Sequence, residues 1–185
     1  MGLANPSGKL PVSFPRNEAD IPVNEPLRYP GVDNKQEYSE GLLMGYRWYD
    51  ARNIEPLFAF GHGLSYTTFD YSDIVVEPAG DEVNVSFTLR NSGQRDGLEV
   101  AQVYLEQQGT DDVFTEVRKL VAFSKVTLTA GESRRLTLTV PARSFDYWDT
   151  AMHDWSQLTG EKIFHVGSSS RDLPLNAMLQ YGPRQ

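Results

Sequence analysis

Pairs of carboxylates are the residues of this sequence that could act as acid and base or bind a cation. Three pairs stand out: Asp111 with Asp112, Glu40 with Asp50, and Asp146 with Asp149. Neighbouring residues of a strand point to opposite faces, so Asp111 and Asp112 suit a solvated loop better than a shared site. None of the pairs belongs to the D-x-D-x-D-G ladder of a calcium loop. We therefore predict no catalytic residue and no metal ligand among them.

Histidine and cysteine give no metal or nucleophile pattern. The three histidines, His62, His153 and His165, lie far apart and show no H-x-x-x-H spacing. The chain has no cysteine, which excludes disulfides, thiolate catalysis and cysteine-bound zinc. We expect no cofactor. His62 stands between two glycines, where we expect a tight turn and an imidazole hydrogen bond across a domain junction.

Three aromatic residues near residue 150 could stack on a sugar, because a pyranose ring has apolar C–H faces. They are Tyr147, Trp148 and Trp155. Aromatic side chains bury large areas and mostly serve cores, so we expect packing to be their main role. We keep all three as candidate sugar-stacking residues and expect Trp155 to be the more exposed of these two tryptophans.

Composition and charge exclude several classes of partner. Of 185 residues, 39% are hydrophobic and 11% aromatic, which is enough for a folded core. The net charge of −8 disfavours nucleic acid and anionic membranes as partners, since both select basic surfaces. No signal peptide opens the sequence, and no apolar run reaches the ~18 residues of a membrane span. We expect a soluble chain and leave its compartment unassigned.

The chain divides into two stretches. Seven of the eleven prolines precede residue 57, so the first third should consist of loops with short extended pieces. Residues 9–14 and 41–50 are the strands we expect there, the latter because it is rich in aromatic residues. From about residue 67 apolar and polar residues alternate, as in Val83, Val85, Phe87 and Leu89. About seven short strands separated by turn residues predict a two-sheet antiparallel β-sandwich.

Three segments resemble, in order, the C-terminal part of glycoside hydrolase family 3, and of its β-glucosidase branch in particular. They are NPSGKLPVSFP at 5–15, YSEGLLMGYRWYD at 38–50 and PLFAFGHGLSYTTFDY at 56–71. The stretches at 119–140, 144–149 and 160–175 also resemble the last domain of such enzymes. The third of the three segments is the most specific.

The resemblance implies an organisation and a function. Residues 1–66 would be the end of an α/β sandwich domain with its linker, and residues 67–185 a fibronectin type III-like domain. The nucleophilic aspartate and the acid/base glutamate of this family would precede Met1, so the chain alone would be inactive. Its parent would hydrolyse terminal β-D-glucosyl residues with retention.

The expected partners are the upstream catalytic domains of that parent, with self-association through residues 1–66 as a further outcome, because strands built for a missing sheet have open edges. The alternative function is a carbohydrate-binding or adhesive β-sandwich module, since architecture alone does not establish function.

Overall fold

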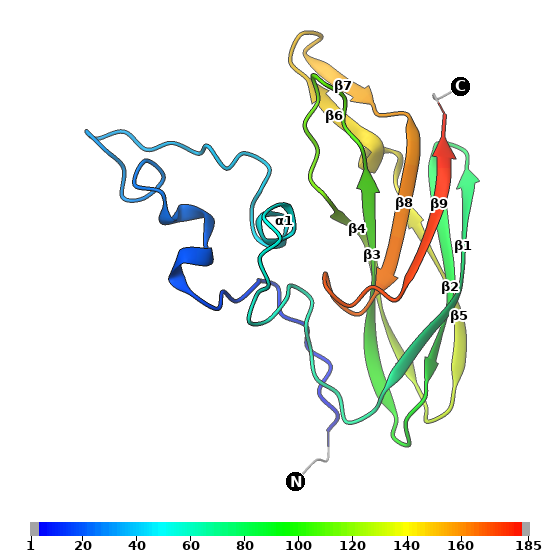
Figure 1. The fold of residues 1–185 in the computed structure, drawn as a ribbon. Helices are drawn as coiled ribbons and strands as arrows, with labels where there is room; N and C mark the ends of the chain where they lie inside the picture. The colour runs from blue at the N-terminus through cyan, green and yellow to red at the C-terminus, as the bar shows by residue number, and fades with distance from the viewer. Residues whose placement is uncertain (1–3, 183–185) are drawn as a thin grey trace.

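Two antiparallel sheets packed face to face form the larger part of the protein (Figure 1). The computed structural model describes residues 4–182. One sheet has the order β1-β2-β5, with β1 at Phe69–Ala79, β2 at Glu82–Asn91 and β5 at Ser133–Val140. The other has the order β4-β3-β8-β9, with β4 at Lys119–Leu128, β3 at Gly97–Gln107, β8 at Gly160–Gly167 and β9 at Leu175–Tyr181. These seven strands confirm the predicted mainly-β, fibronectin type III-like sandwich.

Alternation along the strands produces the core. In β2, Val83, Val85, Phe87 and Leu89 are each 0% exposed, and the residues between them lie partly in solvent. Side chains from the second sheet, such as Val103 and Phe164, meet them in a single apolar cluster. Period-two alternation therefore identified the inward face correctly, because successive side chains of a strand point to opposite sides.

Strand β3 departs from this pattern because it is buried on both faces. Ala101, Val103 and Leu105 face the sandwich core, as expected. Gln102 and Tyr104 point to the other side, yet they are only 3% and 0% exposed. The chain before residue 67 covers that outer face, so β3 is a central strand with a layer on each side.

The segment before residue 67 is mostly irregular, and two expected strands are wrong. Residues 41–50 form a turn and the six-residue helix α1 (Tyr46–Ala51) instead of a strand. Gly45, at φ 55°, precedes the helix in a conformation that favours glycine. Residues 9–14 form no regular strand either, although Phe14 and Phe58 form an isolated antiparallel bridge. Two 3₁₀ turns, Glu18–Asp20 and Pro22–Asn24, complete the regular structure there.

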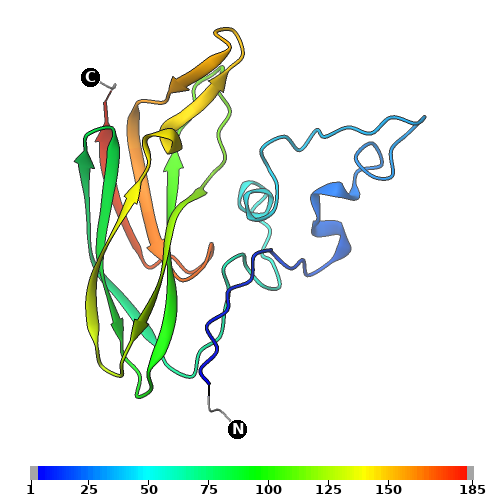
Figure 2. The ribbon, with the colours of Figure 1, turned by 180° about the vertical axis from the view of Figure 1, so that it is seen from behind.

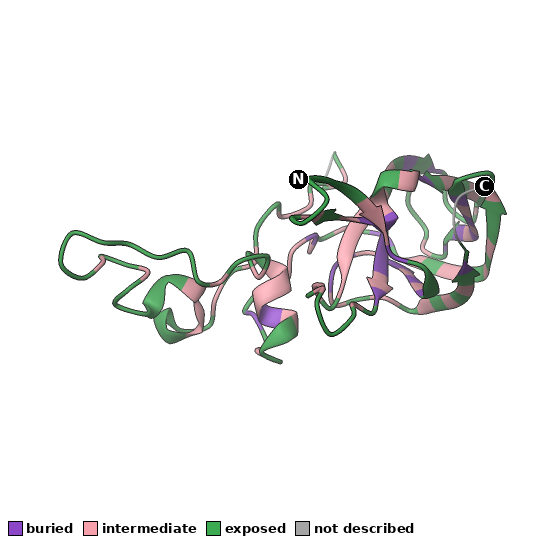
Figure 3. Cartoon of the chain, turned by 90° about the horizontal axis from the view of Figure 1, so that it is seen from above, coloured by how far each residue is buried: buried purple, intermediate pink, exposed green. Residues whose placement is uncertain are grey.

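Residues 15–44, which we call the arm, extend away from the sandwich (Figure 2). Viewed from above, the arm is mostly exposed, whereas the buried residues gather in the sandwich and at its boundary with α1 (Figure 3). Large apolar side chains of the arm lie in solvent, among them Tyr29 at 67% exposed and Tyr38 at 79%. Within residues 4–182, no helix has the length and apolar character needed to cross a membrane.

Two further short strands, which were not predicted from the sequence, form a hairpin at one end of the sandwich. They are β6 (Asp146–Asp149) and β7 (Asp154–Gln157), and the 3₁₀ turn Ala142–Phe145 leads into them. Phe145 is fully buried between Phe164 and Tyr181, so this turn fixes the base of the hairpin to the core.

Replacing Phe87 by alanine should lower the free energy of unfolding by about 3–5 kcal/mol, because it removes a fully buried ring from the centre of the core. Urea denaturation followed by circular dichroism measures this loss. The matched control is Phe123→Ala, which removes a ring that is 65% exposed on β4 and should change stability by less than about 1 kcal/mol. Equal losses for the two variants would contradict the assigned core.

Candidate functional site

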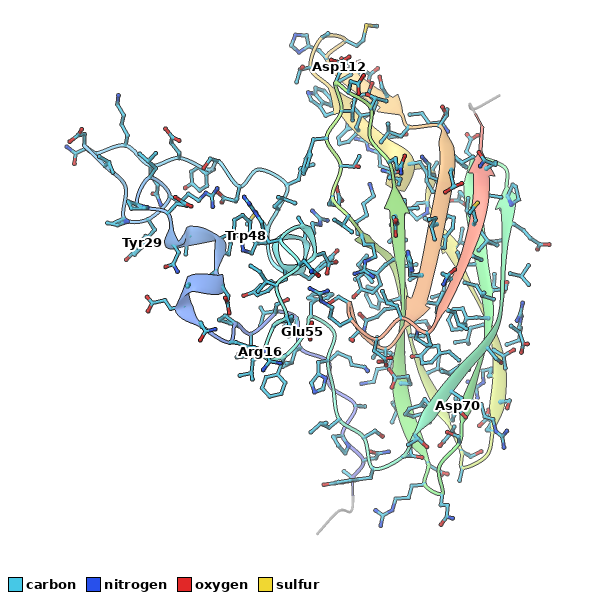
Figure 4. All side chains as sticks on the ribbon, in the orientation of Figure 1. Arg16, Tyr29, Trp48, Glu55, Asp70 and Asp112 are labelled. Carbon is cyan, nitrogen blue, oxygen red and sulfur yellow. The ribbon has the colours of Figure 1, made fainter. Side chains whose placement is uncertain are left out.

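A cleft of about 800 Å³ lies between the β3–β4 loop, residues 108–118, and the β6–β7 hairpin. We call it the aromatic cleft, because Tyr147, Trp148 and Trp155 all line it. Figure 4 shows Asp112, on the loop side, beside the hairpin. Leu42 of the arm also lines the cleft, so three distant parts of the chain build it. Its size is within the usual range of ligand sites, roughly 300–1,000 Å³.

The two tryptophans form a cross-strand pair. Trp148 and Trp155 lie directly opposite each other in the hairpin, with ring centroids 5.5 Å apart at an interplanar angle of 72°. The Arg143 guanidinium lies 3.5 Å from the Trp155 ring centroid. Both rings pack, as expected, but they stay 48% and 42% exposed, with Trp148 the more exposed. The expectation that Trp155 would be the more exposed is therefore wrong.

Polar and charged residues form the floor of the cleft. Gln107, Lys119 and Asp146 line it, and Asp146 is 7% exposed. The Oε1 atom of Gln107 is buried and accepts no hydrogen bond within residues 4–182. Burial lowers the pKa of Lys119, an effect that the nearby Glu116 and Asp146 partly oppose. The floor thus offers an amide, a carboxylate and an ammonium group behind the aromatic wall.

Lys162 lies behind this floor and is 0% exposed. It points to the inner side of β8, and its Nζ donates to the Thr159 carbonyl at 3.3 Å. Burial, with a smaller contribution from the positive charge of Lys119, lowers the pKa of Lys162 to about 8. A buried ammonium with one weak hydrogen bond is costly, so this lysine should destabilise the fold while it is charged.

The carboxylates of the predicted pairs lie in different surroundings. Asp149 Oδ1 accepts the backbone N–H groups of Ala151 and Met152 at 2.9 and 3.1 Å, and so it closes the hairpin turn. Asp111 and Asp112 are exposed in the β3–β4 loop. Within residues 4–182, no three His, Asp or Glu side chains are grouped to hold a metal ion.

Asp50 lies between two arginines where the chain before residue 67 meets the sandwich, a contact we call the junction. Its Oδ1 is 3.3 Å from an Arg118 nitrogen and 3.4 Å from an Arg171 nitrogen, and the side chain is only 2% exposed. Burial raises the pKa of Asp50, while both guanidinium groups act to lower it. The other half of its predicted pair, Glu40, lies 3.6 Å from Arg28.

The junction buries further polar groups on the outer face of β3. Gln102 Nε2 donates to the Ser168 carbonyl at 2.6 Å, and the Tyr104 hydroxyl donates to Gln102 Oε1 at 2.6 Å. The Tyr46 hydroxyl accepts the Leu120 backbone N–H at 2.8 Å. Lys9 forms an ion pair with Glu99 of β3 at 2.7 Å. The Tyr46 and Lys9 contacts hold α1 and the residues around Lys9 against the sandwich.

The turn around His62 contacts another part of the segment before residue 67 through its backbone, and its imidazole makes no hydrogen bond within residues 4–182, so the expected hydrogen bond across the junction is wrong. The His62 carbonyl accepts the Leu10 N–H at 2.8 Å, and its imidazole stacks on Phe58. Gly61 has a φ of 80°, and a Cβ atom there would lie 2.3 Å from Gln102 Oε1. Glycine at position 61 is thus required both by the turn and by the close approach of β3.

Comparison with known proteins identifies the domain type of the sandwich. Residues 99–170 match the fibronectin type III-like domain. The whole described arrangement resembles the crystal structure of DesR, a β-glucosidase from Streptomyces venezuelae, with a TM-score of 0.92 and 44% identity, covering 96% of this chain and 23% of that one.

Two curated relatives extend the comparison. Thermostable beta-glucosidase B of Acetivibrio thermocellus is 43% identical over 182 residues, covering 94% of this chain and 23% of the relative. Exo-alpha-(1->6)-L-arabinopyranosidase of Bifidobacterium breve is 37% identical over 173 residues, covering 93% and 22%. The chain therefore spans less than a quarter of the length of these relatives. It belongs to glycoside hydrolase family 3 and matches the C-terminal part of β-glucosidases of that family.

Replacing Gly61 by alanine should loosen the junction without unfolding the sandwich. The left-handed backbone costs about 1–2 kcal/mol for a residue with a Cβ. In addition, Gln102 must move and lose its buried hydrogen bonds to Ser168 and Tyr104. Limited proteolysis should cut residues 52–66 faster in this variant.

The matched control is Gly80→Ala, in the β1–β2 turn, where φ is 66° and an added Cβ meets no atom within 4 Å. This variant carries the backbone strain alone, so its cleavage at residues 52–66 should equal that of the wild type. Equal protease resistance of the Gly61 and Gly80 variants would show that the junction does not depend on this close approach.

Lys162→Met should stabilise the protein at pH 7 by up to about 3 kcal/mol, because it removes a buried charge while keeping the length of the side chain. The pKa of Lys162 is about 8 when folded and 10.5 as a reference for the unfolded chain. Between these values the unfolded state binds more protons, so the wild type gains stability as pH rises.

Urea titrations from pH 7 to pH 10.5 should therefore show the advantage of the Lys162→Met variant shrinking above about pH 8. Lys125→Met, at an exposed position of β4, is the control and should show no such pH dependence. A stability difference that stays constant with pH would contradict the burial of a charged Lys162.

Proposed function

We propose that this chain is the non-catalytic support module of a β-glucosidase, whose catalytic domains hydrolyse terminal β-D-glucosyl residues with retention. The observation that carries the proposal is the coverage of the relatives: nearly all of this chain corresponds to less than a quarter of a β-glucosidase. In the retaining mechanism two carboxyl groups stand about 5 Å apart on either side of the scissile bond. Of the carboxylates in the predicted pairs, Glu40 and Asp50 pair with arginines, and Asp149 closes the turn of its own hairpin.

The structure of the arm supports a partner on that side of the molecule. Several apolar side chains of the arm are 42–79% exposed. They are Val23, Leu27, Tyr29, Val32, Tyr38, Leu42 and Met44. Large exposed apolar patches on a protein mark surfaces that contact a partner. We infer that the upstream catalytic domains cover these side chains in the parent enzyme. Residues 1–66 would then be the end of an α/β domain with its linker, and residues 67–185 the fibronectin type III-like domain; residues 1–3 and 183–185 lie outside the described residues.

In this proposal the sandwich holds the arm in place for the catalytic domains. Asp50, Arg118 and Arg171 form a buried charge cluster across the junction, and such a cluster fixes the relative position of two parts because any displacement leaves a charge unpaired. The two relatives act, by their names, on different sugars although both match this chain. Sugar preference therefore belongs to the catalytic domains.

A domain exchange tests the proposal. The chain alone should release no product from an aryl β-glucoside. The same chain, replacing the equivalent C-terminal part of thermostable beta-glucosidase B, should retain kcat/KM within about tenfold, or ~1.4 kcal/mol. A well-folded but inactive exchange protein would contradict the proposal, as would turnover by the chain alone that survives repurification and single carboxylate substitutions.

Without the catalytic domains, the exposed apolar residues of the arm should drive self-association. Sedimentation velocity should show a species heavier than a monomer whose fraction increases with protein concentration. The double substitution Tyr29→Ser and Tyr38→Ser should reduce that fraction, whereas Phe123→Ser, an equally exposed aromatic position on β4, should leave it unchanged. A monomer at all concentrations would contradict self-association through the arm.

A further inference from the structure

We propose that the aromatic cleft binds a neutral pyranose unit of an oligosaccharide, with Trp148 as its main stacking platform. Such binding gives the sandwich a role beyond the support proposed above. The proposal stands on the exposure of the two indoles, on the polar floor and on the charge of the cleft.

Trp148 and Trp155 stay exposed to solvent although their rings contact each other. A cross-strand pair of aromatic rings stabilises a hairpin, which explains why Trp148 and Trp155 face each other. That role needs contact between the rings, but it leaves nearly half of each indole in solvent. Exposed, flat apolar rings that a hairpin holds in fixed positions suit the C–H face of a sugar, because such a ring buries area at little entropic cost.

Trp148 is the better platform of the two. The Arg143 guanidinium covers one face of Trp155 at 3.5 Å and fixes its orientation by a cation–π contact. Within residues 4–182, no guanidinium covers the Trp148 ring in this way, and its ring is the more exposed. Trp155 therefore supports and orients the platform.

The floor supplies the polar half of such a site. A sugar presents hydroxyl groups at its ring edge, which both donate and accept hydrogen bonds. Asp146 can accept them and Lys119 can donate. The unpartnered Oε1 of Gln107 provides an acceptor next to the cleft that no protein donor uses in the described chain. An aromatic wall with a few convergent polar groups is the usual composition of a small-molecule site.

The charge of the cleft selects a neutral ligand. Asp112, Glu116, Asp146 and Asp149 line it, and they outnumber the positive charges beside it: Lys119, Arg47 paired with Glu116, and Arg143 on Trp155. An anionic sugar or a phosphate would meet net repulsion there, in a chain that already carries −8. A neutral hexopyranose avoids this repulsion, and its hydroxyl groups can donate to the same carboxylates.

The experiment uses the three tryptophans of the complete chain as reporters. Their indole N–H groups give separate signals in ¹⁵N–¹H correlation spectra. Trp148 and Trp155 line the cleft, whereas Trp48 belongs to α1, donates its Nε1–H to the Asp20 carbonyl at 3.0 Å, and lies away from the hairpin (Figure 4). Trp48 is therefore an internal control within the same molecule.

Titration with cellotetraose, laminaritetraose and maltotetraose should shift the Trp148 and Trp155 signals saturably with at least one sugar, with Kd of about 1 mM, and leave Trp48 unmoved. Trp148→Ala should weaken that binding about tenfold, because it removes the platform. Tyr38→Ala, which removes an aromatic residue that is 79% exposed on the arm, should leave the affinity unchanged. The dispersed spectrum of each variant shows directly whether it is folded.

Absence of any saturable shift with all three sugars would overturn the proposal, and so would shifts confined to Trp48. Equal binding by the folded Trp148→Ala variant would overturn the role of Trp148 as platform. These outcomes are independent of the proposed support function, because the exchange protein can be active whether or not the cleft binds sugar.

Discussion

The double burial of β3 is the constraint on which the rest of the structure depends. Its inner face is part of the sandwich core, and its outer face carries Gln102 and Tyr104, which would be exposed on an isolated sandwich. The residues around Tyr46 and Phe60 cover this outer face, with the Tyr46 ring 5.7 Å from that of Tyr104. Because Gln102 is hydrogen-bonded to both Ser168 and Tyr104, the covered face is specified by polar contacts as well as by packing. The sandwich and the residues that cover this face, around Tyr46 and Phe60, therefore form one structural unit.

The β3–β4 loop connects the junction to the aromatic cleft. Arg47 of α1 lies 3.7 Å from Glu116 of the β3–β4 loop, and the same loop forms one side of the cleft. Arg118, at the end of that loop, pairs with Asp50 of α1. The loop thus contacts the docked helix on one side and the hairpin on the other. In the parent enzyme proposed above, the sandwich would hold its own binding cleft at a fixed position relative to the catalytic domains.

Sequence patterns predicted the sandwich well, because alternation depends only on which face of a strand is buried. They failed at residues 41–50, where aromatic residues suggested a strand and the chain forms α1. A helix of six residues is too short to be stable alone, so contacts such as that of Tyr46 with β3 determine it. The three aromatic residues of the cleft were identifiable by type. Their meeting with the 108–118 loop was not, since residues about 40 positions apart come together only through the sheet order.

Hydrogen exchange of backbone amides tests the central claim most directly, namely that the junction is an integral part of this fold. The informative amides are those of Leu120 and Ser170, which donate to the Tyr46 hydroxyl and the Phe60 carbonyl across the junction. We expect them to exchange as slowly as the amides of β2, at the centre of the sandwich, because one cooperative unit opens as a whole. Rapid exchange of these two amides while β2 stays protected would show that the junction opens on its own, and would contradict the account.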